Sequence, residues 1–127
     1  MITGFAHVAL YTPHLEQTVS FYQKVFLAKT IKAFDRPHKG CWLSLGENIL
    51  EVFESEPLGD GLFKHIAIAC DDVDAYFHLA LSHGATSHVP PKDITQPVPA
   101  RIAFVKGPSG EQIELFSSMC RDKDTAQ

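Results

Sequence analysis

The sequence predicts an α+β fold made of two similar halves, each with one strand, one helix and three further strands, the first of which is faint in both halves. The first observation is a repeated opening, FAHVAL from position 5 and FKHIAI from position 63, with the alternation typical of a strand. The second is a repeated ending, GENILEVF from position 46 and GEQIELF from position 110. A half this small cannot bury a core alone, so the halves are expected to pack together or to exchange with a second chain.

Composition limits the class of protein. The 127 residues suit one ordinary domain, and 45% hydrophobic with 20% charged residues is typical of soluble globular proteins. A net charge of −4 gives no basic surface for nucleic acid. We find neither a signal peptide nor an apolar run near the roughly 18 residues of a membrane span. The three scattered cysteines (Cys41, Cys70 and Cys120) indicate reduced thiols, so a cytoplasmic location is expected.

The first module is expected over about 4–54. Alternation predicts a strand over 5–11, and Thr12-Pro13 suit the cap and the start of a helix of about three turns, ending near Phe26. A basic, turn-rich segment follows at 34–40. Two short strands, at 41–45 and 49–53, then flank a turn at 46–48.

The second module is expected over about 62–118, after a linker at 55–61 that is rich in glycine and proline. A strand over 63–70 leads to a helix that Asp71-Asp72 can cap and Gly84 can end. Strands at 102–105 and 112–116 and a polar tail at 119–127 complete the chain.

Four prolines fall within 89–99. They exclude a central strand, because proline cannot donate to a sheet ladder. We therefore predict that residues 89–99, within the 87–99 segment, form a loop that could border a site.

The candidate functional residues are one histidine and one glutamate that recur in each half, His7 with Glu51 and His65 with Glu114. Their strand faces also carry aromatic residues and alanines, whereas the opposite faces are apolar and are expected to lie under the helices. A solvated face would carry more lysine, threonine and serine, so these side chains are expected to be partly buried.

A single histidine or glutamate on a strand is more often solvated than a ligand. Here the pair occurs twice, and burying two carboxylates without a partner would cost several kcal/mol. One divalent metal would remove that cost, and neutral imidazoles would complete its ligand shell.

The other histidines give weaker signals. His14, His78, His83 and His88 have no repeated partner and are expected to be exposed. Arg36 and His38 could meet an anionic substrate, although a solvated loop explains them more simply.

Four motifs resemble the vicinal-oxygen-chelate superfamily, the glyoxalase/bleomycin-resistance/dioxygenase group. They are HVAL from position 7, SFYQKVF from position 20, HIAI from position 65 and GPSGEQIEL from position 107. The resemblance extends from about Phe5 to Phe116. It implies two paired βαβββ modules that form a cupped mixed sheet around a metal, with the helices on the outer face.

Within that superfamily the His/Glu/His/Glu order resembles glyoxalase I. The resemblance implies Ni²⁺ or Zn²⁺, with Co²⁺ or Mn²⁺ possible, and a homodimer. It also implies proton transfer through a metal-bound enediolate of a small α-hydroxycarbonyl or a thiol hemithioacetal, with Glu114 as the main acid/base and Glu51 as its counterpart. The expected substrate pocket contains Tyr11, Phe53, Phe63 and Phe116.

Three positions depart from the pattern. Tyr11 and Ser55 stand where bacterial glyoxalase I usually has the Arg and Asn that help hold glutathione, and Gly107 replaces the usual Asp. The thiol substrate therefore stays open.

Two alternatives remain. One is another metalloenzyme of the superfamily: an epimerase, a thiol transferase or an extradiol dioxygenase. The other is a drug-binding resistance protein without metal, although such proteins generally lack the ligand residues. Glu51→Gln should spare a three-ligand enzyme and inactivate a four-ligand one.

Overall fold

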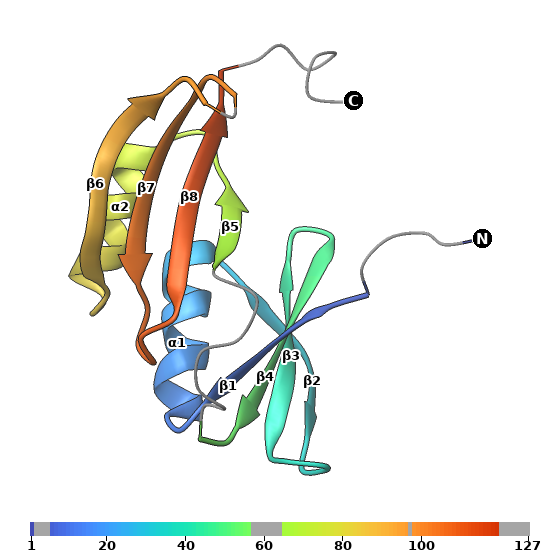
Figure 1. Cartoon of the computed structure of the whole chain (residues 1–127). Helices are drawn as coiled ribbons and strands as arrows, with labels where there is room; N and C mark the ends of the chain where they lie inside the picture. Colours follow the sequence, from blue (N-terminus) through green and yellow to red (C-terminus); the bar gives the residue numbers. More distant parts are fainter. Residues whose placement is uncertain (2–5, 57–64, 97, 120–127) are drawn as a thin grey trace. The chain divides into compact units, whose positions relative to one another are not determined.

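The computed structural model describes residues 1, 6–56, 65–96 and 98–119. It divides into two compact units, Met1–Leu62 and Phe63–Gln127, each with one helix and one four-stranded sheet (Figure 1). Both units follow the order strand, helix, three strands. The α+β class and the two βαβββ modules are thus confirmed.

In the first unit the sheet order is β1-β4-β3-β2. β1 runs parallel to β4, and the other neighbours are antiparallel. The elements are β1 (Val8–Thr12), α1 (Leu15–Phe26), β2 (Lys29–Phe34), β3 (Gly40–Leu45) and β4 (Asn48–Glu54).

The core of the first unit lies between α1 and the inner strands. Tyr22 and Val25 of α1 are buried, as are Leu43 of β3 and Leu50 and Val52 of β4. Because side chains alternate along a strand, this burial turns Glu51 to the other face of the sheet. One expectation was wrong: Val8, placed under the helix by parity, is 47% exposed.

The start of α1 also differs from the prediction. The N-cap residue is His14, without a side-chain cap, and Thr12 is the last residue of β1. The Thr12 hydroxyl accepts a hydrogen bond from the His14 N–H (3.0 Å) and is hydrogen-bonded to Thr18 Oγ1 (2.9 Å). Thr12 therefore stabilises the turn into the helix from two residues before its cap.

In the second unit the sheet order is β5-β8-β7-β6, with β5 parallel to β8, and α2 covers one face (Figure 1). The Asp72 carboxylate caps α2 by accepting from the Ala75 N–H at 3.0 Å, as predicted. The elements are β5 (Ile66–Ala69), α2 (Val73–Ser82), β6 (Thr86–Ile94), β7 (Ala100–Lys106) and β8 (Gln112–Ser118).

The loop predicted at 89–99 was wrong over residues 89–94, because β6 continues to Ile94 and includes Pro90 and Pro91. β6 is the edge strand of its sheet, and its pairing with β7 shifts register on both sides of Val89. An edge strand tolerates proline because one of its sides needs no partner. The exclusion of a central strand was therefore correct.

The predictions of reduced cysteines and of no membrane span can be compared with only part of the chain. Cys41 and Cys70 are free thiols, whereas Cys120 lies outside the described residues, as does most of the linker. Among the described helices, none is long and apolar enough to cross a membrane.

Candidate metal centre

The two His–Glu pairs occupy the same position in their units. Glu51 of β4 lies opposite Ala9 of β1, and Glu114 of β8 lies opposite Ala67 of β5. His7 and His65 directly precede β1 and β5, two residues before these alanines. The sequence repeat is therefore also a repeat of strand register.

In each unit the imidazole lies beside the carboxylate. His7 Nε2 is 3.3 Å from Glu51 Oε1, and His65 Nε2 is 3.1 Å from Glu114 Oε1. Both glutamate side chains are only 14% exposed, whereas the histidines are 38% and 37% exposed. The structure thus brings each predicted pair together, with the carboxylate at the sheet and the imidazole towards solvent.

These separations fit two ligands of one metal ion. Two atoms about 2.1 Å from a shared ion, at an angle of about 90–110°, lie about 3.0–3.4 Å apart. In the described part of the chain no three His, Cys, Asp or Glu side chains gather into one group. Each unit therefore supplies two candidate ligands, and their role as ligands stays a prediction.

Trp42 is a site residue that the sequence analysis missed. It lies opposite Glu51 in the β3–β4 ladder, and its Nε1–H donates a hydrogen bond to Glu51 Oε2 at 2.8 Å. Its ring centroid is 6.0 Å from that of His7. The signal was present, because a hairpin that turns at Gly46-Glu47 pairs position 42 with position 51.

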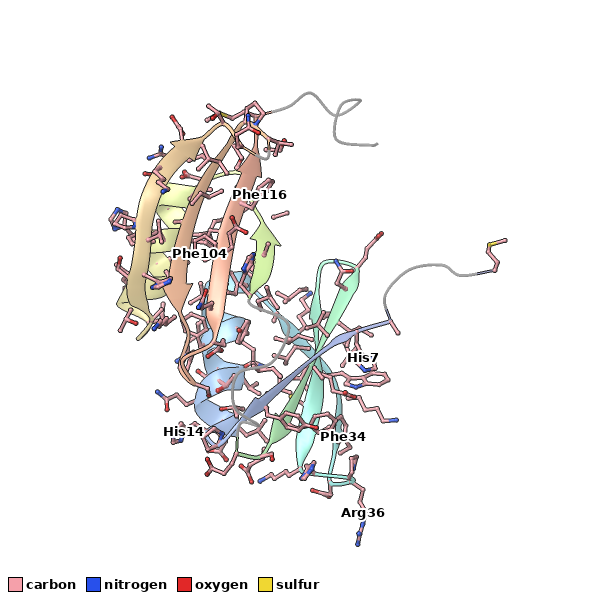
Figure 2. The ribbon with its side chains drawn as sticks, in the orientation of Figure 1. His7, His14, Phe34, Arg36, Phe104 and Phe116 are labelled. Atoms are coloured by element: carbon pink, nitrogen blue, oxygen red, sulfur yellow. The ribbon has the colours of Figure 1, made fainter. Side chains whose placement is uncertain are left out.

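Phe104 is the residue of the second unit that corresponds to Trp42. It lies opposite Glu114 in the β7–β8 ladder. Its ring meets the His65 ring edge-on, with the centroids 5.1 Å apart. Figure 2 labels Phe104 on β7 and His7 on the other unit. The two carboxylates thus have different neighbours despite their equal register.

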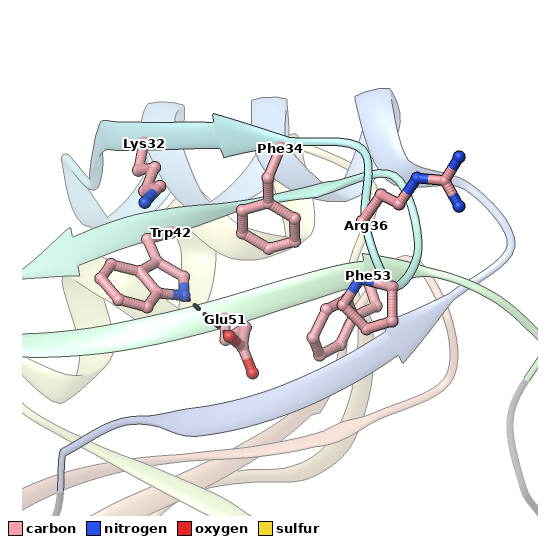
Figure 3. A pocket seen from close by; sticks show the side chains of 7 residues that line it. Lys32, Phe34, Arg36, Trp42, Glu51 and Phe53 are labelled. Carbon is pink, nitrogen blue, oxygen red and sulfur yellow. Dashed lines mark hydrogen bonds between the residues drawn. The ribbon is translucent and has the colours of Figure 1, made fainter.

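A small pocket of about 200 Å³ opens beside Glu51 in the first unit (Figure 3). Phe34, Trp42 and Phe53 supply its aromatic walls, and Lys32 and Arg36 are exposed cationic residues at its rim. In Figure 3 the Arg36 guanidinium points away from the aromatic rings. The pocket thus combines an apolar lining, a carboxylate and nearby positive charge.

The predicted substrate residues are only partly placed here. Phe53 lines the pocket, and Tyr11 stacks on it with ring centroids 5.6 Å apart. Phe116 lies on β8 of the second unit (Figure 2), where it pairs with Ile102 of β7. Phe63 lies outside the described residues. Their contribution to a substrate site stays a prediction. His38, from the basic loop, lies within 6.2 Å of Tyr11 and 5.9 Å of Phe53, centroid to centroid.

The chain belongs to the Glyoxalase/Bleomycin resistance protein/Dioxygenase superfamily, whose family model matches residues 4–115. This match confirms the resemblance seen in the sequence motifs. The comparison with curated protein sequences gave no match.

Several solved structures share the fold. The fosfomycin resistance protein FosX from Listeria monocytogenes (hexagonal form) is 22% identical with a TM-score of 0.79, covering 94% of this chain and 96% of that one. FosX from Mesorhizobium loti is 20% identical with a TM-score of 0.72, covering 99% and 98%. The hypothetical protein SA1046 from S. aureus is 19% identical with a TM-score of 0.71, covering 92% and 98%. At these identities the likeness concerns the fold alone.

Proposed function

We propose that this protein is a metal-dependent enzyme in which His7, Glu51, His65 and Glu114 hold one divalent ion. The observation that carries the proposal is the repeated His–Glu pair, at 3.3 Å and 3.1 Å, in the same strand register of both units. The two pairs can be joined within one chain or between two copies, and we propose a homodimer.

The donor set suits such an ion. Two ionised carboxylates carry the two negative charges that balance a divalent cation, and two neutral imidazoles add nitrogen donors. Ni²⁺ and Zn²⁺ are the first candidates, with Co²⁺ and Mn²⁺ next, since mixed imidazole and carboxylate ligands suit all four. In support, a structure of a Listeria monocytogenes FosX mutant is described as a complex with Mn(II) and 1S,2S-dihydroxypropylphosphonic acid.

The proposed reaction moves a proton between adjacent carbons of a small α-hydroxycarbonyl or a thiol hemithioacetal. A bound divalent ion supplies Lewis acidity that makes the carbon-bound hydrogen easier to remove. Glu114 takes that proton and returns it to the neighbouring carbon, so the product is an isomer and no oxidant or reductant is needed. The aromatic pocket beside Glu51 receives the apolar part of the substrate.

A second candidate function is metal-dependent chemistry on a phosphonate such as fosfomycin. It is favoured by the fold shared with the FosX proteins and by Lys32 at the rim of the pocket, whose ammonium lies over the Trp42 ring. We propose Glu51 as a ligand only for the proton-transfer enzyme, which has four protein ligands, and three protein ligands for the phosphonate enzyme. Glu51→Gln should inactivate an enzyme with four protein ligands and spare one with three.

The first test is the metal content per chain. Protein purified without an affinity tag is reconstituted with Ni²⁺, Zn²⁺, Co²⁺ or Mn²⁺ in turn and measured by plasma mass spectrometry. We expect about one tightly held ion per chain. The His65→Ala variant should lose it, because one of the nitrogen donors is removed.

The matched control is His88→Ala. His88 is an exposed histidine of β6, and its ring lies 6.3 Å from that of Phe104, so this variant should keep its ion. Loaded protein is then assayed with hemithioacetals of several thiols and, separately, with fosfomycin. If the unaltered chain holds no ion with any of the four metals, the metalloenzyme proposal is wrong and a drug-binding role replaces it.

A further inference from the structure

We propose that Trp42 is a positioning residue that makes the two glutamates of the duplicated site unequal. Its indole N–H fixes Glu51 as a ligand through a single oxygen, whereas Glu114 keeps the freedom to leave the ion and carry a proton. This inference rests on the proposed function, and it assigns different tasks to residues that the sequence repeat makes look equivalent.

The two oxygens of Glu51 face different partners. Oε2 accepts the hydrogen bond from Trp42 Nε1 at 2.8 Å, drawn as a dashed line in Figure 3. Oε1 lies 3.3 Å from His7 Nε2. Rotation of the carboxylate would break the hydrogen bond to the indole. Oε1 is therefore the oxygen that stays beside His7, in position for coordination through one atom.

The indole is itself held in place. Trp42 lies on the inner strand β3, directly opposite Glu51, and the Lys32 ammonium lies 5.8 Å from the centre of its ring. The indole is planar, its strand is paired, and a cation lies against the ring. It therefore loses little further conformational freedom when it donates a hydrogen bond to the carboxylate.

The second unit has no matching donor in this position. Phe104 stands opposite Glu114, and a phenyl ring has no N–H to donate. Phe104 makes a T-shaped contact with the His65 ring instead of a hydrogen bond to the carboxylate. Glu114 can therefore rotate or withdraw without breaking a bond to its cross-strand neighbour, as a group that both binds an ion and transfers a proton must do.

The test separates the N–H of Trp42 from the bulk of its ring. Trp42→Phe keeps a ring and removes the donor, whereas Trp42→Gln removes the ring and keeps an N–H of similar reach. Zn²⁺ and Co²⁺ affinities are measured by isothermal titration calorimetry on full-length protein, with circular dichroism to show that each variant is folded. We expect Trp42→Phe to weaken binding by about 10–100-fold, the usual cost of losing such a partner. Trp42→Gln should restore most of that loss.

Phe104→Leu provides the comparison in the second unit, since it removes a ring beside Glu114 without removing a donor. The ring contacts the proposed ligand His65 but donates no hydrogen bond, so any loss of metal affinity should be smaller than the loss in Trp42→Phe. Equal losses in Trp42→Phe and Trp42→Gln, or no loss in Trp42→Phe, would overturn the positioning role while leaving the metal site standing. Absence of binding in the unaltered chain would instead overturn the proposed function, and with it this inference.

Discussion

Arg101 of β7 connects α2 and β6 of the second unit by binding one carboxylate on each element. Its guanidinium donates to both oxygens of Asp74 on α2, at 2.6 and 2.8 Å, and to Asp93 on β6 at 3.0 Å. The hydrogen bonds from Arg101, together with its charge, lower the pKa of the Asp74 carboxyl below its ordinary value of 3.8. The planar guanidinium suits this two-point contact in a way that a lysine would not.

This contact should make the stability of the fold depend on pH. A lowered pKa in the folded state means that the contribution is fully present above about pH 3.8 and is lost as the pH falls below it. Asp74→Asn should therefore lower Tm at neutral pH, and the gap to the unaltered chain should narrow in acid. Thermal unfolding followed by circular dichroism across this range measures the gap.

Glu47→Gln is the control for the Asp74 experiment. Glu47 is an exposed carboxylate in the β3–β4 turn, and its replacement should leave Tm nearly unchanged throughout. A Tm gap for Asp74→Asn that stays constant from neutral to acid pH would show that the ion pair does not stabilise the fold.

Single residues also show how far the sequence could predict the site. The repeat and the alternation were enough to pair His7 with Glu51 and His65 with Glu114, because both depend only on position along a strand. Trp42 was missed because its role depends on the neighbouring strand: register puts it opposite Glu51, and its rotamer aims the N–H at the carboxylate. A hydrogen bond between side chains of neighbouring strands can be predicted only when both the strand register and the rotamer are known.

At the scale of elements, one side chain caps the start of α2. The Asp72 carboxylate satisfies the Ala75 N–H, one of the donors that a helix leaves unpaired in its first turn. Asp72→Ala should therefore destabilise the fold by about 1 kcal/mol, as measured by urea unfolding.

The neighbouring Asp71 provides a matched control for the cap. It lies one residue earlier, is exposed and is not the N-cap residue, so Asp71→Ala should change the free energy of unfolding far less. Similar losses in the two variants would point to the general negative charge near the helix start rather than to the cap hydrogen bond.

Two elements mark the limit of local sequence patterns. The prolines of β6 correctly excluded a central strand but could not show that the segment forms an edge, because strand order is set by tertiary packing. The threonine before α1 has the chemistry of a cap, yet its hydroxyl bonds to His14 and Thr18 instead. In both cases the residue type limited the possible structures, and the residues packed around it determined which one formed.

At the scale of the whole molecule, the two units repeat one design, with the first strand of each parallel to the last. Each supplies only two candidate ligands from its described residues. If the site is completed by a second copy, the protein should behave as a particle of twice the 14.1 kDa chain mass in size-exclusion chromatography with light scattering. A monomer that still holds one ion would show instead that one chain supplies all four ligands.

Trp42 is the only tryptophan in the chain, and it is hydrogen-bonded to one proposed ligand and lies beside another. All indole fluorescence of this protein therefore originates at the candidate centre. Paramagnetic ions such as Ni²⁺ or Co²⁺ arriving there would quench that emission, and diamagnetic Zn²⁺ would change it without the same quenching. The protein thus carries its own optical reporter, with which metals and small molecules can be screened without any label.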